Sequence, residues 1–77
     1  MQHSLMSTIA DQVRLLRISK GWSQEELAAR CGLHRTYVGA VERAERNITV
    51  GTLCKLAQAL DCDVTDLLSL NIRGNKQ

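Results

Sequence analysis

A single glycine, Gly32, divides the middle of the sequence into two helical segments that are each too short to be stable alone. Before it, Leu27 and Cys31 lie four residues apart, which is the spacing of one helix face. After it, Val38 and Val41 lie three residues apart. Glycine can take the left-handed conformation that ends a helix, and isolated helices shorter than about 12 residues are marginal in water. The two segments must therefore pack on each other across a short turn.

The first of these segments has a clear start. In the sequence Ser23-Gln-Glu-Glu26, the Ser23 hydroxyl can accept a hydrogen bond from the amide of Glu26, and the Glu26 carboxylate can reach back to the amide of Ser23. We therefore expect one helix to begin at Gln24 and a second helix to end near Arg43 or Ala44. Two helices joined by a glycine turn are typical of the helix-turn-helix motif, whose second helix lies in the major groove of DNA.

Helical spacing and capping residues predict three more helices. The first covers about residues 8–20, with Thr8 or Asp11 at its start and Gly21 at its end. The other two begin after Thr49 and Asp63, which are both capping residues. We expect an all-α fold, a compact five-helix bundle over residues 8–70, with a flexible N-terminus (residues 1–7) and a flexible tail (residues 71–77). The apolar faces of the last two helices comprise Leu53, Leu56, Ala57 and Leu60, and Val64, Leu67 and Leu68.

Composition argues against several classes of protein. A chain of 77 residues forms one small domain, which leaves little room for a catalytic cleft, and no nucleophile, base and orienting group occur together, so we expect no enzyme. Cys31, Cys54 and Cys62 match no zinc spacing, and we expect them to fill apolar sites, with no metal and no other cofactor. No signal peptide or membrane-spanning run is present, so we expect a cytoplasmic protein without membrane contact.

The net charge of +2 is too small to indicate a nucleic-acid ligand by itself. The distribution is more informative, because residues 30–46 carry four arginines against two glutamates, whereas three aspartates gather between residues 61 and 66. We therefore expect one basic and one acidic face.

The segment WSQEELAARCGLHRTYVGAVERAERNITVGTLCKLAQALDCDVTDLLS resembles the DNA-binding domain of the lambda-repressor and Cro (XRE) superfamily. It shares the Gln that starts the second helix, Glu-Leu-Ala, the turn glycine, Glu-Arg after the recognition helix, and Leu-x-x-Leu-Ala-x-Ala-Leu. Within the superfamily, RTYVGAVERAERN followed by ITVGTL is similar to the controller proteins of restriction-modification systems. The resemblance implies a sequence-specific transcription regulator, an activator or repressor, that binds a palindromic operator in double-stranded DNA as a homodimer.

The resemblance also implies which side chains contact bases. The superfamily's base-contacting positions fall on His34, Arg35, Thr36 and Ala40, and Ala40 can offer only a methyl group. Arg35 can donate two parallel hydrogen bonds to guanine, and Thr36 can meet a base edge or a thymine methyl group. Tyr37 resembles a DNA contact of the controller proteins, although packing of its ring on the helix is an equally good interpretation.

Phosphate contacts are expected around the same surface. Gln24 and Ser23 lie at a helix N-terminus, where free amides and the helix dipole favour an anion. At the other end of the recognition helix, Arg43, Arg46 and Asn47 resemble the controller-protein residues that contact the DNA backbone or minor groove. Of these three, Arg46 is the best candidate for a second base contact.

Two further groups of residues have structural roles. By the family pattern, Arg17 faces Glu42 in a partly buried ion pair that fastens the recognition helix to the rest of the domain. The last helix has more apolar residues than its own packing requires, so we expect the side chains of Val64, Leu67 and Leu68 to meet their two-fold mates in a homodimer.

Three interpretations remain open from the sequence. Glu25 matches a position where some superfamily members contact RNA polymerase, but an acid in the first turn also stabilises the helix dipole. Gly39 either allows close approach to DNA or is a tolerated substitution. The alternative to a controller protein is a phage-type or antitoxin-type repressor whose surface mainly binds a protein partner.

Overall fold

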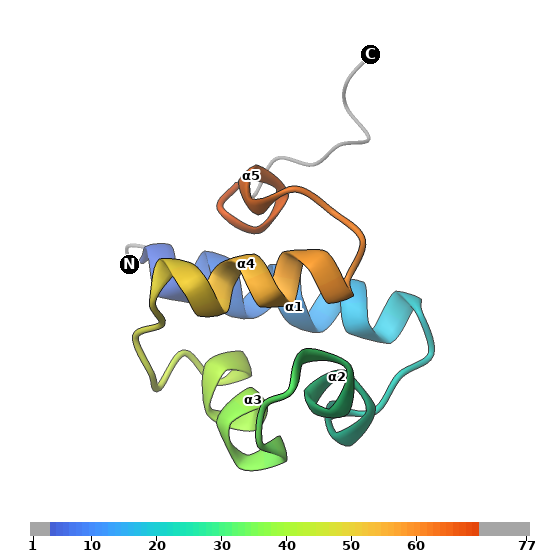
Figure 1. Ribbon diagram of the computed structural model, residues 1–77. Coiled ribbons are helices and arrows are strands. Elements are labelled where there is room, and N and C mark those ends of the chain that lie inside the picture. Colours follow the sequence, from blue (N-terminus) through green and yellow to red (C-terminus); the bar gives the residue numbers. More distant parts are fainter. Residues whose placement is uncertain (1–3, 70–77) are drawn as a thin grey trace.

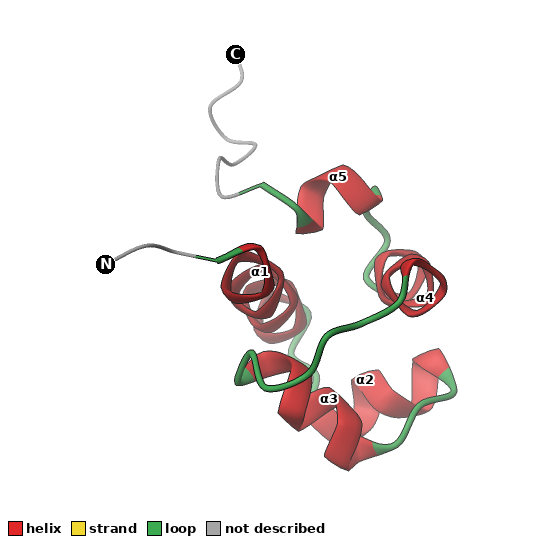
Figure 2. Cartoon of the chain, turned by 90° about the vertical axis from the view of Figure 1, so that its left-hand side faces the viewer, coloured by secondary structure: helices red, strands yellow, loops and turns green. Residues whose placement is uncertain are grey.

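The computed structural model of the protein describes residues 4–69, which form five α-helices and no β-strand. This confirms the expected all-α class and the number of helices. Helices α1 and α4 lie on opposite sides of the molecule in Figure 2, with the α2–α3 pair below them and α5 above them (Figures 1 and 2). The helices are α1 (Leu5–Ser19), α2 (Gln24–Cys31), α3 (Arg35–Glu42), α4 (Val50–Ala59) and α5 (Val64–Leu67).

Helix α1 begins three residues earlier than the sequence predicted. Ser4 is its N-cap, and the Ser4 hydroxyl accepts a hydrogen bond of 3.0 Å from the amide of Ser7. The Thr8 hydroxyl, expected to cap the helix, instead donates to the carbonyl oxygen of Ser4 at 3.3 Å and is buried. Residues 4–7, which we expected in the flexible N-terminus, therefore form the cap and first turn of α1. The expected flexible tail at residues 71–77 lies outside the described residues.

The helix-turn-helix segment largely follows its prediction. The Ser23 hydroxyl accepts from the amide of Glu26 at 2.9 Å, and Gly32 ends α2 with a φ of 71°. The Glu26 carboxylate, expected to bond back to Ser23, is instead in an ion pair with Arg30 at 2.8 Å, because Arg30 lies one helical turn further along the same face. Helix α3 ends at Glu42, slightly earlier than predicted.

The two C-terminal helices also begin where their caps predicted. The Thr49 hydroxyl accepts from the amide of Thr52 at 3.1 Å at the start of α4. Asp63 caps α5, and Asp66 completes a reciprocal capping box that the sequence analysis missed, with a bond of 3.0 Å from the Asp63 amide. Helix α5 has only four residues, so this box fixes most of its short backbone.

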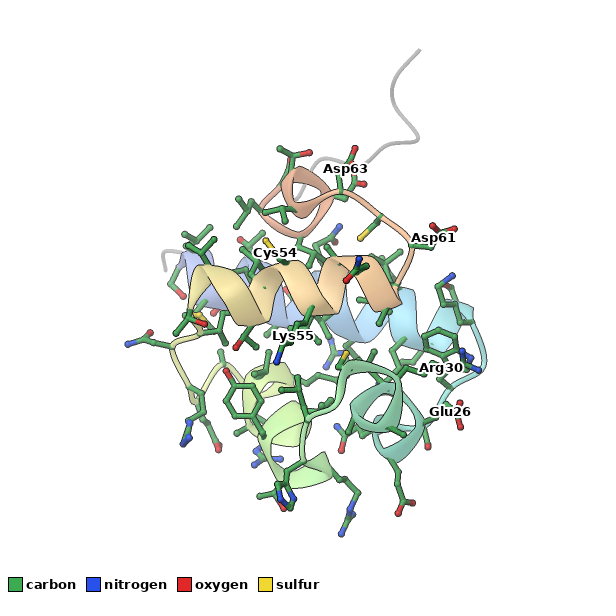
Figure 3. All side chains as sticks on the ribbon, viewed as in Figure 1. Glu26, Arg30, Cys54, Lys55, Asp61 and Asp63 are labelled. Carbon is green, nitrogen blue, oxygen red and sulfur yellow. The ribbon has the colours of Figure 1, made fainter. Side chains whose placement is uncertain are left out.

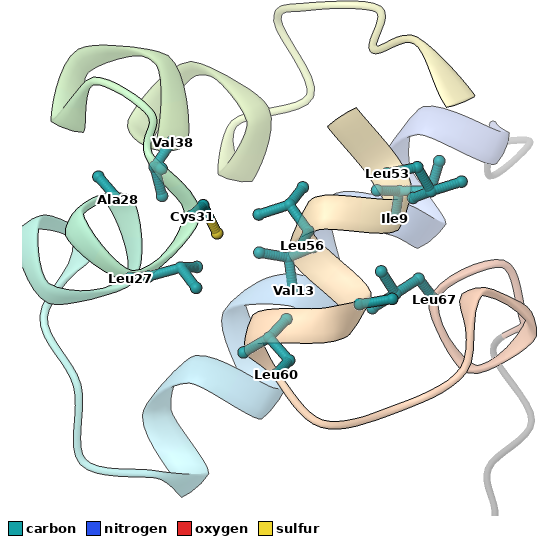
Figure 4. Packing of buried hydrophobic residues seen from close by; sticks show 11 residues of the cluster. Ile9, Val13, Leu27, Ala28, Cys31, Val38, Leu53, Leu56, Leu60 and Leu67 are labelled. Carbon is teal, nitrogen blue, oxygen red and sulfur yellow. The ribbon is translucent and has the colours of Figure 1, made fainter. Parts of the chain in front are cut away.

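The core lies where α1, α2, α3 and α4 meet, and α5 closes one side of it (Figure 4). The largest fully buried side chains come from all five helices, and they are Leu27, Leu56, Leu60, Leu67, Val13, Val38 and Val41. The prediction for the cysteines is partly wrong, because Cys31 is buried but Cys54, in α4, is exposed. Between residues 4 and 69, none of the helices combines the length and apolar character that a membrane span requires.

Candidate nucleic-acid interface

The N-terminal end of α3 forms an exposed edge of the molecule, next to α2 and far from α5 (Figures 1 and 2). His34, Arg35 and Thr36 are all exposed there. The side chains of Arg35 and Thr36 take part in no hydrogen bond or ion pair with residues 4–69. Their donors and acceptors are therefore available to a ligand without breaking any contact that holds the fold together.

A groove of about 570 Å³ opens beside this end of α3, between the α2–α3 turn and the first turns of α4. Tyr37 and Arg46 both line it, and the Arg46 guanidinium lies 5.4 Å from the centre of the Tyr37 ring. Tyr37 is half-buried, so its ring packs on the fold while one side faces the groove. A cation over a tyrosine ring is attracted by the ring's negative face, and this contact orients Arg46 beside the exposed end of α3. The residues that line the groove are Gly32, Leu33, His34, Thr36, Tyr37, Ala40, Arg46 and Thr52.

The residues expected at phosphates lie on both sides of this surface. Ser23 is exposed at the N-terminus of α2, with its hydroxyl accepting the capping bond. Gln24 is half-buried, and its side-chain amide donates to Glu42 Oε1 at 3.1 Å. Since an amide group has two hydrogens, only one is committed to Glu42. The other amide hydrogen of Gln24 is therefore free to bind a further acceptor.

Beyond the C-terminal end of α3, Arg43, Arg46 and Asn47 are exposed. Arg43 pairs with Glu45 at 3.1 Å, but both side chains are 57% exposed. Exposed ion pairs of this kind contribute little free energy, so Arg43 can exchange Glu45 for another anion at small cost. Ala44 has a φ of 58°, a left-handed conformation that turns the chain sharply after α3 and that the sequence did not indicate.

Arg17 and Glu42 form the predicted ion pair, with two nearly parallel bonds. Arg17 Nε donates to Glu42 Oε2 at 2.7 Å and Arg17 Nη2 donates to Glu42 Oε1 at 2.9 Å. The two side chains are 13% and 3% exposed. Arg17 Nη1 also donates to the carbonyl oxygen of Trp22 at 2.8 Å. The hydrogen bond to Glu42 raises the pKa of Arg17, as does the charge of Glu42, while burial acts in the opposite direction. This network fastens α3 to α1 and to the α1–α2 connection.

Two contacts near this network were not predicted from the sequence. The Trp22 ring lies under two cations, with the Arg30 guanidinium carbon 4.1 Å and the Lys20 nitrogen 5.4 Å from its centre. Gly39 is buried in α3 beside Gln24 and Arg43. Spacing in the sequence could not reveal either contact, because each depends on how α2 is packed against its neighbours.

The expected dimer residues do not share one exposed face. Leu67 is 0% exposed and belongs to the core of its own chain, so the prediction that it faces a partner is wrong. Val64 is half-buried and Leu68 is 37% exposed. Helical spacing identifies an apolar face on a short helix, but it does not show what covers that face. In α5, the Leu67 side chain packs against the core of the same chain.

A second groove, of about 790 Å³, has a strongly apolar lining. It lies where the beginnings of α1 and α4 approach the end of α5, and Leu5, Val50 and Leu68 are exposed along it. We call this surface the apolar groove. Its lining residues are Ser4, Leu5, Met6, Ile9, Ala44, Asn47, Ile48, Val50, Leu53 and Leu68.

Asp61 and Asp63 are exposed near α5, whereas Arg30 lies on α2 towards the opposite side of the molecule, next to Glu26 (Figure 3). Within residues 4–69, no three His, Cys, Asp or Glu side chains are grouped so that they could hold a metal ion. The surface around α3 is therefore suited to a polyanion by its charge and by its free donors.

Comparison with known proteins agrees with this geometry. The helix-turn-helix family model HTH_3 matches residues 13–67. A hypothetical transcription factor of Neisseria meningitidis is 49% identical over 67 residues, which are 87% of this chain and 63% of that protein's length. Control protein C.SmaI of Serratia marcescens is 49% identical over 69 residues, 90% of this chain and 82% of that protein.

Two solved structures have the same fold and considerable sequence identity. The restriction-modification controller protein C.AhdI from Aeromonas hydrophila has a TM-score of 0.78 at 45% identity, over 80% of this chain and 94% of that one. The controller protein C.Esp1396I, solved as a tetramer in complex with its natural 35 base-pair operator, has a TM-score of 0.77 at 30% identity, over 86% of this chain and 87% of that one. The chain thus belongs to the XRE-type helix-turn-helix family of DNA-binding transcription regulators, in which it is similar to the restriction-modification controller proteins.

Proposed function

We propose that the protein is a restriction-modification controller that binds a palindromic operator as a homodimer, with α3 of each copy in the major groove. The observation that carries this proposal is the contrast between the two ends of α3. Its C-terminal end is fixed by the buried Arg17–Glu42 pair, while Arg35 and Thr36 at its N-terminal end are exposed and without protein partners within the described chain. A rigid helix with free donors at its exposed end is suited to reading base edges.

Arg35 is the principal base contact in this proposal. Its guanidinium donates to N7 and O6 of guanine, and such a bidentate pair discriminates against other bases by about 1–3 kcal/mol. Thr36, His34 and Tyr37 lie around it and contact neighbouring base edges or sugars. Arg46 leaves the Tyr37 ring to contact a base, at a cost of about 0.5–1 kcal/mol because the Arg46 side of the contact is exposed.

Phosphates on either side hold α3 in register. The free amides at the N-terminus of α2, with Ser23 and the second hydrogen of the Gln24 amide, bind one phosphate. Arg43 and Asn47 bind another beyond the end of α3. If a dimer makes about six such contacts, log K falls with log[salt] with a slope of about −5.

The homodimer forms through the apolar groove in this proposal, with Leu68 from the end of α5 and Leu5 and Val50 beside it. A domain of this size contacts too few bases alone, and a two-fold dimer doubles the number by placing two helices about 34 Å apart. Exposed leucine and valine side chains along one apolar surface are typical of a surface that a second copy covers. The operator complex of the C.Esp1396I tetramer supports assembly of more than one copy on DNA.

Bound at its operator, the protein controls its own gene and a linked endonuclease gene. Glu25 is exposed on α2, where it can contact RNA polymerase when the dimer occupies a site beside a promoter. Activation at low occupancy and repression at high occupancy are the regulatory outcomes that the similarity to controller proteins implies.

Selection of duplexes from a random pool tests this function. The wild-type protein should enrich a palindrome, and Arg35→Ala should lose about 5- to 150-fold of the preference for that palindrome over a scrambled duplex. The control is Arg14→Ala, because Arg14 is also an exposed arginine but lies on α1, paired with Asp11 at 3.7 Å. If no palindrome is enriched, the proposal is wrong, and a repressor that mainly binds a protein partner becomes the better interpretation.

A further inference from the structure

Gly39 occupies an unusual place, because it is buried in the middle of α3 although glycine weakens a helix. Its backbone does not require glycine, since the glycines with positive φ in the described chain are Gly21 and Gly32. The surroundings explain it better. A Cβ atom added at Gly39 would lie 3.3 Å from Oε1 of Gln24 and 3.2 Å from Nη1 of Arg43. Both distances are shorter than ordinary van der Waals contact.

The two neighbours differ in how easily they can move. Arg43 is exposed, and its guanidinium can swing away at small cost. Gln24 is half-buried, and its side-chain nitrogen donates to Glu42 Oε1 at 3.1 Å. The Gln24 amide therefore lies between Gly39 and Glu42, with its oxygen beside the glycine and its nitrogen on the carboxylate.

Glu42 connects this amide to the rest of the fold. Its two carboxylate oxygens accept from Arg17 of α1 and, through Oε1, from Gln24 of α2. Three helices thus meet at one carboxylate, and the Gln24 amide is a polar contact between α2 and α3 at this point. A displacement of this amide by a few tenths of an ångström away from Gly39 would disturb the geometry of its 3.1 Å bond to Glu42.

We propose that Gly39 and Gln24 act together as positioning residues for base recognition: the missing Cβ of Gly39 leaves the space for the Gln24 amide, which holds Glu42 and sets the position of α3. This proposal rests on the proposed function, because the position of α3 matters most when Arg35 and Thr36 meet bases. The two roles of Gln24 have different consequences for binding. Loss of a phosphate contact weakens binding to every sequence alike, whereas loss of the positioning role lowers the preference for the operator sequence.

A double-mutant cycle tests the proposal with four proteins: wild type, Gly39→Ala, Gln24→Ala and the double variant. Each is unfolded thermally, and each is bound to the palindrome selected by the wild type and to a scrambled duplex of equal length. Gly39→Ala and Gln24→Ala are each expected to lower the ratio of the two affinities by about tenfold, a factor within the range of one impaired base contact. The double variant should lose no more than Gln24→Ala alone, because the substitution at Gly39 acts through Gln24.

Unfolding gives an independent measure of the same coupling. In the Gln24→Ala background the added methyl group meets no amide, so Gly39→Ala should raise the unfolding midpoint by up to roughly 4–8 °C, the gain from helix propensity alone. In the wild-type background most of this gain should be lost. The matched control is Gly51→Ala in α4, where a Cβ would meet only Thr49 Oγ1 at 3.8 Å, so its effect should be the same in both backgrounds.

The experiment distinguishes failure of the positioning role of Gly39 and Gln24 from failure of the proposed DNA-binding function. Equal effects of Gly39→Ala in both backgrounds, on the midpoint and on the affinity ratio, would overturn the inference. Coupling in the midpoint with an unchanged affinity ratio would also overturn it, since the contact would then serve only stability. If the wild type selects no palindrome, the proposed function fails and the positioning role fails with it, whereas a selective wild type with additive variants rejects the positioning role alone.

Discussion

Substitution of Arg17 by methionine is the most severe single change that the structure predicts for this domain. Methionine keeps an unbranched apolar side chain in α1 but removes the three hydrogen bonds that Arg17 donates, two to Glu42 and one to the carbonyl oxygen of Trp22. Glu42, whose side chain is 3% exposed, would keep only the bond from Gln24. A buried carboxylate would then lack its counter-charge.

The magnitude follows from this burial. Removing one partner of a buried ion pair costs about 3–5 kcal/mol, much more than an exposed pair is worth. At about 0.05–0.15 kcal/mol per residue, the 77-residue chain has a total stability of roughly 4–12 kcal/mol. Arg17→Met should therefore lower the unfolding midpoint by more than about 12 °C. Because the bond to Glu42 raises the already high pKa of Arg17, the contribution of the pair persists as pH rises and is lost only in strong alkali.

Chemical and thermal unfolding at neutral pH measure this loss. Arg14→Met is the matched control on the same helix, because the Arg14–Asp11 pair is about half exposed, and it should change stability by less than about 0.5 kcal/mol. The double variant Arg17→Met with Glu42→Leu should recover most of the loss, since it leaves no unpaired charge. A loss below about 1 kcal/mol for Arg17→Met would refute the reasoning and mean that water screens the pair.

Three further predictions concern other parts of the molecule. Leu68→Lys places a charge in the apolar groove, and sedimentation at about 50 μM should then find a monomer where the wild type is a dimer; a monomeric wild type would contradict the proposed interface. Thr49→Ala removes the cap of α4 and should cost about 1 kcal/mol in thermal unfolding, and an unchanged midpoint would contradict the capping role. Burial raises the pKa of the Cys31 thiol above its ordinary value of 9.0, so the unfolded chain releases this proton first and the free energy of unfolding should fall as pH rises above about 9. Cys31→Val should remove this part of the fall in the free energy of unfolding, whereas Cys54→Ser, at an exposed cysteine, should not. Equal pH profiles for the wild type and both variants would reject the role of Cys31.

Local chemistry accounts for the parts of the fold that were predictable from the sequence. The caps at Ser23 and Thr49 and the left-handed end at Gly32 each depend on residues within about four positions, so the residue types determine the geometry. Local residue types were not sufficient at the start of α1. Ser4 and Thr8 are both capping residue types, and only packing selects Ser4 as the N-cap. The Arg17–Glu42 pair joins residues 25 positions apart, and only the family resemblance indicated it.

Other features depend on how the helices cross. Helical period gives α5 an apolar face but not its orientation, and Leu67 turned out to face the core of its own chain. The contact between Gly39 and Gln24 exists because α3 packs against α2 at one particular position, which no spacing along the chain encodes. The exposure of Arg35 and Thr36 at the end of α3 agrees with the sequence prediction, while their base contacts remain a proposal.

Substitution of single guanines in the selected operator by 7-deazaguanine tests the central claim most directly, because it removes only the N7 acceptor from the major groove. We expect one guanine in each half-site at which this change weakens wild-type binding by part of the roughly 5- to 150-fold that the whole bidentate pair contributes. The same change should have no effect on Arg35→Ala, since the variant no longer uses that acceptor. If Arg35→Ala remains as sensitive as the wild type at every guanine, Arg35 does not read guanine, and the proposed role of the exposed end of α3 is wrong.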